Sequence, residues 1–241
     1  MQLIINQTLS TELTLPIAYH HILQSILYNN MNGQDHYSDF IHNEGYTFQD
    51  RRFRMFTFGL LEGKYSIQDG KISFRDEVSF EVRSPDHRLI KILKENMEVK
   101  GIRYPDRTIT DIKLSLRDEQ VEENHILIKM QSPLSVYSTD EKTKQTYFYT
   151  PEESRFATMV NDNFKRKYSA YTGIMPLSDV IIKPVTVSPK DKYVTNYKGF
   201  YLSGWKGKYE LIGEKKYLDF LYQAGIGAKN AQGFGLFHIV K

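Results

Sequence analysis

Residues 216–240 read KYLDFLYQAGIGAKNAQGFGLFHIV and contain the most unusual stretch of the chain. The apolar spacing over 216–222 predicts a helix that ends at Gly225, and the apolar run 234–240 predicts a strand. Between these two elements, residues 225–235 hold four of the protein's 15 glycines. This helix, glycine-rich loop and strand form the end of a longer pattern, which the preceding residues supply.

The remainder of the second half provides one helix and three strands. Residues 126–128 predict a strand, and a capping box of Thr150 and Glu153 predicts the start of a long helix. The apolar positions over 180–212 predict a long hairpin. Together with the last helix and strand, residues 120–241 therefore read β-α-β-β-α-β, the split βαβ pattern.

The first half gives the same order of elements without an obvious sequence repeat. The predicted elements are a strand at 3–5, a helix from Pro16, strands at 55–61 and 72–82, a helix after Pro85 and a strand at 109–116. Residues 117–124 are very polar and suit a linker. The sequence thus predicts an α+β protein of two tandem ferredoxin-like (βαββαβ) domains, with boundaries at 1–119 and 120–241.

Composition narrows the class of protein. The chain has no Cys, which excludes disulfides and thiolate metal sites and fits a reducing cytoplasm. Residues 1–21 lack the features of a signal peptide, and no stretch approaches the ~20 apolar residues of a membrane span. Residues 1–120 carry 15 Lys and Arg against 17 Asp and Glu, whereas residues 121–241 carry 17 against 12. We expect a cytoplasmic protein with no membrane segment, whose basic half either meets a polyanion or is merely solvated.

The glycine-rich loop has two open interpretations. It is not a Rossmann loop, because a helix precedes it and a strand follows it, and it lacks the Gly-Lys-Ser/Thr of a P-loop. It is either a tight helix-to-strand connection or a polyanion-binding loop whose exposed N–H groups surround phosphate. Polar side chains within it favour the second interpretation. The candidate RNA-binding residues of the loop are Gly225, Gly227, Lys229, Asn230, Gly233 and Gly235.

The loop, ending in Gly-Phe-Gly at 233–235, resembles the signature of the repeat-associated RNA-binding superfamily of CRISPR systems. Three further stretches, in order, resemble segments of its precursor-crRNA endoribonucleases: 23–28 (LQSILY), 40–45 (FIHNEG) and 53–58 (FRMFTF). The resemblance implies metal-independent cleavage of CRISPR repeat transcripts without a cofactor. The ribose 2′-hydroxyl attacks the adjacent phosphate and leaves a 2′,3′-cyclic phosphate and a 5′-hydroxyl.

The resemblance also implies the catalytic residues. His42 matches the family's catalytic histidine, on a short helix expected between a cap at Asp35 and a stop at Gly45. Tyr28 and Arg54 match the accompanying positions, and Arg54 stands where the family often has Lys. His36 is the fallback candidate for His42, and Tyr28 could instead continue the apolar stripe of its helix.

Arg51 and Arg52, beside Arg54, are candidates for phosphate contacts or for solvated surface. Arginine can stabilise a phosphorane but cannot donate a proton at neutral pH.

Two other functions remain open. A non-catalytic RNA-binding subunit of a CRISPR ribonucleoprotein complex would keep the loop and the basic half while His42 had no role. A small-molecule phosphate enzyme on the same fold lacks a recognisable nucleotide motif. The expected partner is CRISPR repeat RNA, with a CRISPR effector complex as a further candidate, and the chain could act as a monomer or a homodimer. No HExxH motif, Cys/His cluster or Asp-x-Asp array suggests a metal site.

Overall fold

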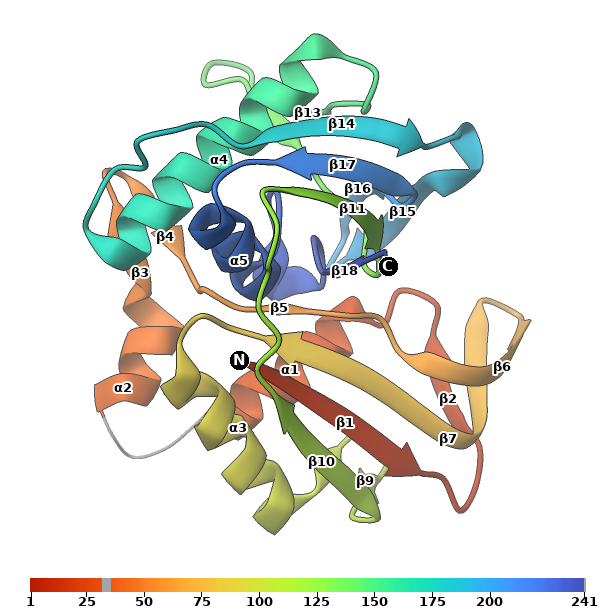
Figure 1. Cartoon of the computed structure of the whole chain (residues 1–241). Coiled ribbons are helices and arrows are strands. Elements are labelled where there is room, and N and C mark those ends of the chain that lie inside the picture. Colours follow the sequence, from red (N-terminus) through yellow and green to blue (C-terminus); the bar gives the residue numbers. More distant parts are fainter. Residues whose placement is uncertain (32–35, 241) are drawn as a thin grey trace.

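Two antiparallel sheets, each with helices packed on it, follow one another along the chain (Figure 1). The computed structural model describes residues 1–31 and 36–240, and the side chains of His36, Ser38 and His42 fall outside that description. The predicted cap Asp35 therefore lies outside the described residues as well. One connection, residues 118–124, joins the two sheets.

The first sheet is built around one long strand. Its strands are β1 (Gln2–Thr8), β2 (Leu13–Pro16), β5 (Thr57–Phe58), β6 (Glu62–Gln68), β7 (Lys71–Arg83) and β10 (Ile112–Arg117). Along one edge of β7 lie β1 and β2, and along the other lie β5 and β6. Since β10 pairs with the outer edge of β1, the order is that of a ferredoxin-like sheet.

The helices of this half pack on the sheet through the predicted apolar positions. Helix α1 spans His20–Met31 and helix α3 spans His87–Lys100. The Asp86 carboxylate caps α3 by accepting a hydrogen bond from the Arg88 N–H group, at 3.1 Å. Between α1 and β5 lie a short helix α2 (His36–Asp39), a π-helical turn η1 (Phe40–Glu44) and the hairpin of β3 (Tyr46–Phe48) and β4 (Arg51–Phe53). A further hairpin pairs β8 (Ile102–Arg103) with β9 (Thr108–Ile109).

The second half has the same topology. Its sheet contains β11 (His125–Met130), β14 (Ile181–Thr186), β17 (Lys208–Ile212) and β18 (Phe237–Ile239), in the order β14-β17-β11-β18. Helix α4 (Ser154–Thr172) joins β11 to β14, and helix α5 (Lys215–Ala224) joins β17 to β18. Both halves are thus ferredoxin-like, and the predicted α+β fold is confirmed.

Two hairpins are added to the second half. The pair β12 (Tyr137–Thr139) and β13 (Thr146–Phe148) precedes α4, and the pair β15 (Lys192–Tyr197) and β16 (Phe200–Trp205) separates β14 from β17. The hairpin expected over 180–212 is confirmed in the antiparallel pairing of β14 with β17, but it is interrupted, because β15 and β16 form a hairpin of their own between those strands. A 3₁₀ turn η2 at Pro189–Asp191, in which Ser188 and Asp191 form a capping box, separates β14 from β15.

Two predicted helix starts are displaced by a few residues. Pro16 is the last residue of β2, so α1 begins at His20 instead. Helix α4 begins at Ser154, because Glu153 has an extended backbone and is the N-cap. The Glu153 carboxylate still accepts the Thr150 N–H group, as the predicted capping box requires.

The two halves are joined by a buried ion-pair network. Arg83 of β7 is 1% exposed, forms an ion pair with Glu81 and donates to the Phe237 carbonyl oxygen of the second half at 2.8 Å. Its guanidinium also lies 3.8 Å from the centre of the Tyr222 ring. Burial would raise the pKa of Glu81, but His238 at 2.9 Å and Arg83 outweigh it and hold that pKa at about 2. The network fixes β7 of one half against β18 and α5 of the other.

We expect Arg83→Met to lower the free energy of unfolding by about 3–5 kcal/mol, because Glu81 would lose its buried cationic partner. Arg75→Met is the matched control, since the Arg75 side chain is 56% exposed in its ion pair with Glu12 and should contribute under about 1 kcal/mol. Urea denaturation measures both variants. Similar losses for the two would show that the network does not hold the halves together.

Candidate functional site

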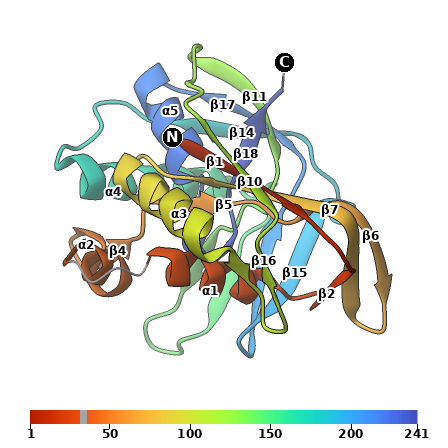
Figure 2. The ribbon, with the colours of Figure 1, turned by 90° about the horizontal axis from the view of Figure 1, so that it is seen from below.

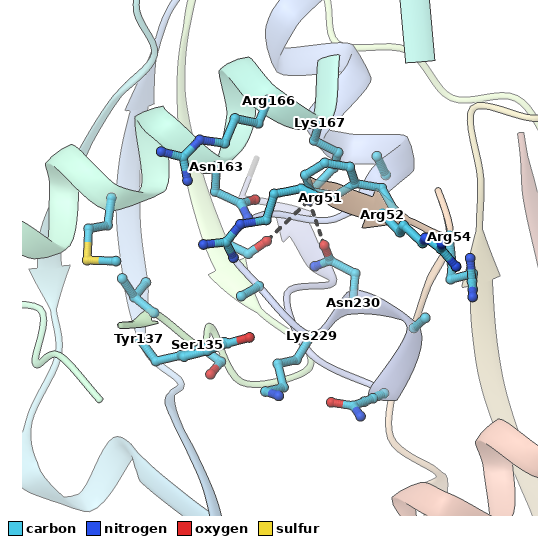
Figure 3. Close-up of a pocket in the computed structure, with 18 of the residues that line it drawn as sticks. Arg51, Arg52, Arg54, Ser135, Tyr137, Asn163, Arg166, Lys167, Lys229 and Asn230 are labelled. Atoms are coloured by element: carbon cyan, nitrogen blue, oxygen red, sulfur yellow. Dashed lines mark hydrogen bonds between the residues drawn. The ribbon is translucent and has the colours of Figure 1, made fainter. Parts of the chain in front are cut away.

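A cleft of about 630 Å³ opens between the two halves (Figure 3). The first half contributes α1 and the segment around β4, and the second contributes α4, the β12 segment and the glycine-rich loop. Its cationic lining residues are Arg51, Arg52, Arg54, Arg155, Arg166, Lys167 and Lys229. Among the lining residues that the structure describes, Asp162 is the one acid. A concave surface lined by one sign of charge attracts a polyanion.

The side chain of Lys167, on α4, donates hydrogen bonds to the glycine-rich loop and holds it in place. Its side chain is 2% exposed, and its ammonium donates to the carbonyl oxygens of Gly225 at 2.8 Å and Gly227 at 3.2 Å and to Asn230 Oδ1 at 2.6 Å. Desolvation lowers the pKa of Lys167 to about 7. The Asn230 amide in turn donates to the Ile226 and Phe234 carbonyl oxygens. The hydrogen bonds of Lys167 and Asn230 therefore hold the two ends of the loop, at Gly225–Gly227 and at Phe234, next to each other.

The loop glycines lie against protein atoms. A Cβ atom at Gly225 would lie 2.8 Å from Thr57, and one at Gly233 would lie 2.7 Å from the Phe58 ring. At Gly227 it would collide with Leu134 and Ser135, and at Gly235 with the Ile226 carbonyl. Each of the four has a positive φ. Glycine is thus required here because the loop packs closely between the two halves.

Some N–H groups of the loop are used within the protein. Ile226 donates to the Gly235 carbonyl oxygen, Ala228 to that of Ser135, and Gly235 to that of Pro133, so these three are not available to a phosphate. Side chains also bring polar groups from the loop to the cleft. The Lys229 ammonium lies 4.7 Å from the centre of the Tyr137 ring.

Residues spaced one turn apart on one face of α1 contact the glycine-rich loop. His20 Nδ1–H donates to the Gln232 carbonyl oxygen at 3.0 Å, while Nε2 accepts from the Tyr193 hydroxyl at 2.9 Å. Burial lowers the pKa of His20 to about 4, so the ring is neutral at pH 7. Gln24, one turn on, donates to the Ala231 carbonyl oxygen at 2.6 Å. The next residue on this face is Tyr28, which lines the cleft.

Tyr28 and Arg54, two of the three predicted catalytic residues, meet in the cleft. Burial raises the pKa of Tyr28, while the Arg54 charge and its hydrogen bond to the phenol lower it in part. The phenol is therefore protonated at neutral pH and able to donate. The Tyr28 ring also packs edge-on against Phe56, at 5.8 Å between ring centres.

The third predicted residue, His42, belongs to the segment that the arginines contact. The Arg54 guanidinium lies against Gly45, so that a Cβ atom there would collide with it, and Gly45 has a φ of +67°. Arg52 donates to the Asn43 carbonyl oxygen at 3.2 Å. His42 is in the π-helical turn that ends between these two contacts, and its side chain lies outside the described residues, as does that of His36. The remaining candidate, Arg51, lines the cleft from β4.

Two groups of residues that line the cleft were not predicted from the sequence. Arg155 shares one face of α4 with Met159, Asp162 and Arg166, at a spacing that the helix period would have revealed. Tyr137 and Ser135 come from the segment before α4 and carry no recognisable pattern in the sequence.

Among the residues that the structure describes, no group of three or more His, Cys, Asp or Glu side chains is arranged to hold a metal ion. No described helix has the length and apolar character needed to cross a membrane.

Two ferredoxin-like halves with a glycine-rich loop before the last strand, beside a cationic cleft, define a class of RNA-binding proteins of CRISPR systems. The chain belongs to the Cas6 family within it, because the family model for the C-terminal region of CRISPR-associated protein Cas6 matches residues 116–239.

Proteins similar to this chain include two archaeal endoribonucleases. The chain is 23% identical over 231 residues to CRISPR-associated endoribonuclease Cas6 1 of Methanocaldococcus jannaschii, which covers 92% of this chain and 86% of that protein. It is 28% identical over 105 residues to CRISPR-associated endoribonuclease Cas6 of Pyrococcus furiosus, covering 44% and 38%. A solved structure of a Cas6-related protein from Pyrococcus furiosus has a TM-score of 0.83 at 20% identity and covers 100% of this chain and 98% of its own. This likeness supports the fold.

We expect Lys167→Met to lower the free energy of unfolding by about 2–3 kcal/mol, because three acceptors in the loop would lose their donor inside the protein. Arg166→Met is the control, since Arg166 is the exposed neighbour on α4 and should change stability by under about 0.5 kcal/mol. Urea denaturation measures both. Equal stabilities would contradict the role assigned to Lys167.

Proposed function

We propose that this chain is an endoribonuclease that cleaves CRISPR repeat transcripts into crRNAs. The observation that carries the proposal is the contact of Tyr28 with Arg54 in a cationic cleft, beside the turn that bears His42. Membership of the Cas6 family and the named activity of the two archaeal relatives support it.

The cleft has the charge and shape to bind an RNA backbone. Arg51 and Arg52 line it from β4, Arg166 from α4 and Lys229 from the loop (Figure 3). Arg155, on α4, lines it as well. Each phosphate neutralised by such a side chain releases counterions, so affinity falls steeply with salt. In this proposal, the Lys229 side chain makes the loop's contact with the RNA. Asn230 and the glycines Gly225, Gly227, Gly233 and Gly235 hold the loop in the shape that this contact needs.

The three side chains have complementary roles in internal phosphoryl transfer. The 2′-hydroxyl attacks the neighbouring phosphorus and releases its proton to solvent water, the P–O5′ bond breaks, and the O5′ atom gains a proton from a general acid. His42 is the proposed general acid for O5′, because imidazole titrates near neutral pH. Arg54 and the Tyr28 phenol would stabilise the charge that develops on the phosphorane oxygens. This chemistry requires no metal ion and leaves a 2′,3′-cyclic phosphate and a 5′-hydroxyl.

We also propose that the two halves divide these tasks. Residues 1–119 would carry the reacting side chains, and residues 120–241 would carry the glycine-rich loop and most of the RNA-binding charge. The alternative function, a non-catalytic RNA-binding subunit, needs the cleft but gives His42 no role. This alternative is favoured if the purified protein binds repeat RNA tightly but does not cleave it.

We expect purified protein to cleave its host's repeat RNA in excess EDTA, with a 2′,3′-cyclic phosphate on the upstream product. A 2′-deoxy substitution at the nucleotide before the cut should abolish cleavage while leaving binding nearly unchanged, because it removes the attacking oxygen alone. Gel analysis with and without acid opening of the cyclic phosphate measures both. Cleavage of the deoxy substrate would rule out internal attack.

We expect His42→Ala to slow single-turnover cleavage by at least about a hundredfold, the usual effect of losing a general acid. Tyr28→Phe and Arg54→Ala should slow it less, and Tyr28→Phe should leave RNA affinity unchanged. His87→Ala is the control, since His87 is an exposed histidine at the start of α3. If His42→Ala cleaved as fast as this control, the role of His42 as general acid would be wrong, and His36→Ala would be tested next.

A further inference from the structure

The hairpin of β15 and β16 stands at the edge of the cleft. The Tyr197 hydroxyl near its tip donates to the side-chain oxygen of Gln24, a residue of α1 that lines the cleft. Tyr197 and Leu202 also form a small apolar cluster with Phe234 of the loop, against which Phe148 of β13 packs. Figure 2 shows the two strands running beside α1. These contacts fix the position of the hairpin tip relative to the cleft.

Two aromatic side chains at this tip are left exposed. Phe200 is 73% exposed and Tyr201 is 72% exposed, whereas Tyr197 is 8% exposed. Successive residues of a strand point to opposite faces, and directly paired residues share a face. Because Phe200 pairs with Tyr197 in the register, it lies on the face that turns toward α1 and the cleft. Tyr201 pairs with Asn196 and lies on the opposite face.

Phe200 is therefore an unpacked aromatic ring on the face of the hairpin from which Tyr197 reaches the cleft-lining Gln24. Leu202, on the same face, is buried, so the apolar contacts that stabilise the hairpin are made without Phe200. The adjacent turn residue Lys198 adds a positive charge at the tip. Exposed aromatic rings bordered by cations are the arrangement by which proteins stack the bases of single-stranded RNA.

We propose that Phe200 stacks on a base of the single-stranded RNA that enters the cleft, and so extends the RNA-binding site onto the hairpin. The proposal rests on the function proposed above. Stacking on one ring tolerates any base, so Phe200 would contribute affinity and placement of the strand rather than recognition of a particular base. Tyr201, on the far face, would not contact this RNA.

The test compares Phe200→Ala with Tyr201→Ala, because the two rings are neighbours of equal exposure on opposite faces. Binding of a repeat RNA made uncleavable by a 2′-deoxy substitution is measured by filter binding. Phe200→Ala should weaken binding roughly 5- to 150-fold, the range found for the loss of one stacked base. Tyr201→Ala should change it by less than about twofold. Equal effects of the two variants would overturn the proposal.

A second measurement detects the stacking itself. The fluorescent base 2-aminopurine, which stacking quenches, is placed at each position of the repeat in turn. At one position the wild-type protein and Phe200→Trp should quench it more than Phe200→Ala does. If the hairpin serves only the fold, the wild-type protein and Phe200→Ala should quench 2-aminopurine equally at every position. That result would overturn the proposal. If the wild-type protein cleaves the repeat and Phe200→Ala binds it as tightly as wild type, the Phe200 contact is wrong but the proposed function stands. If the wild-type protein neither binds nor cleaves the repeat, the proposed function itself is wrong.

Discussion

The contact on which the rest of the site depends is the one between Lys167 and the glycine-rich loop. A buried ammonium is costly unless all its protons are bonded, and the two loop carbonyls and Asn230 accept all three. Because Asn230 also bonds both arms of the loop, this one cation fixes the loop's shape from the second half. The first half then docks on that shape through His20 and Gln24, which sets the position of α1 and therefore of Tyr28.

The cleft concentrates like charges that the fold must keep close together. Arginines from β4 and α4 face it from opposite halves, and their repulsion opposes the association of those halves. The ion pair of Arg83 and Glu81, to which His238 is hydrogen-bonded, lies at a different part of the same boundary. The Arg83 and Glu81 side chains are 1% and 11% exposed, so solvent screens their attraction little. Because this pair is separate from the arginines of the cleft, the two halves stay together although the cleft is strongly cationic.

Hydrophobic periodicity predicted the elements that have one buried face and missed those that have none. The stripe of α3, from Leu89 to Met97, is buried as its spacing predicts. Strand β6 is exposed along its whole length, so no alternation of buried apolar residues marked it. In the site, Lys167 belongs to a run of three basic residues, and only the packed helix shows that it alone of the three points inward. A family resemblance pointed to Tyr28 and Arg54, but their contact depends on how α1 packs against the segment that follows β4, where Phe56 meets the Tyr28 ring.

The packing of the loop changes how its glycines should be interpreted. A loop that served affinity alone could be altered without effect on the chemical step. Here Gly225 packs against Thr57 and Gly233 against Phe58 and His20, all residues of the half that carries Tyr28. A Cβ atom at either glycine would collide with these residues, so a substitution there disturbs the contact between the two halves as well as the loop. The proposed binding and the proposed chemistry therefore both depend on these glycines, whereas the Lys229 side chain lines the cleft and belongs to the proposed binding alone.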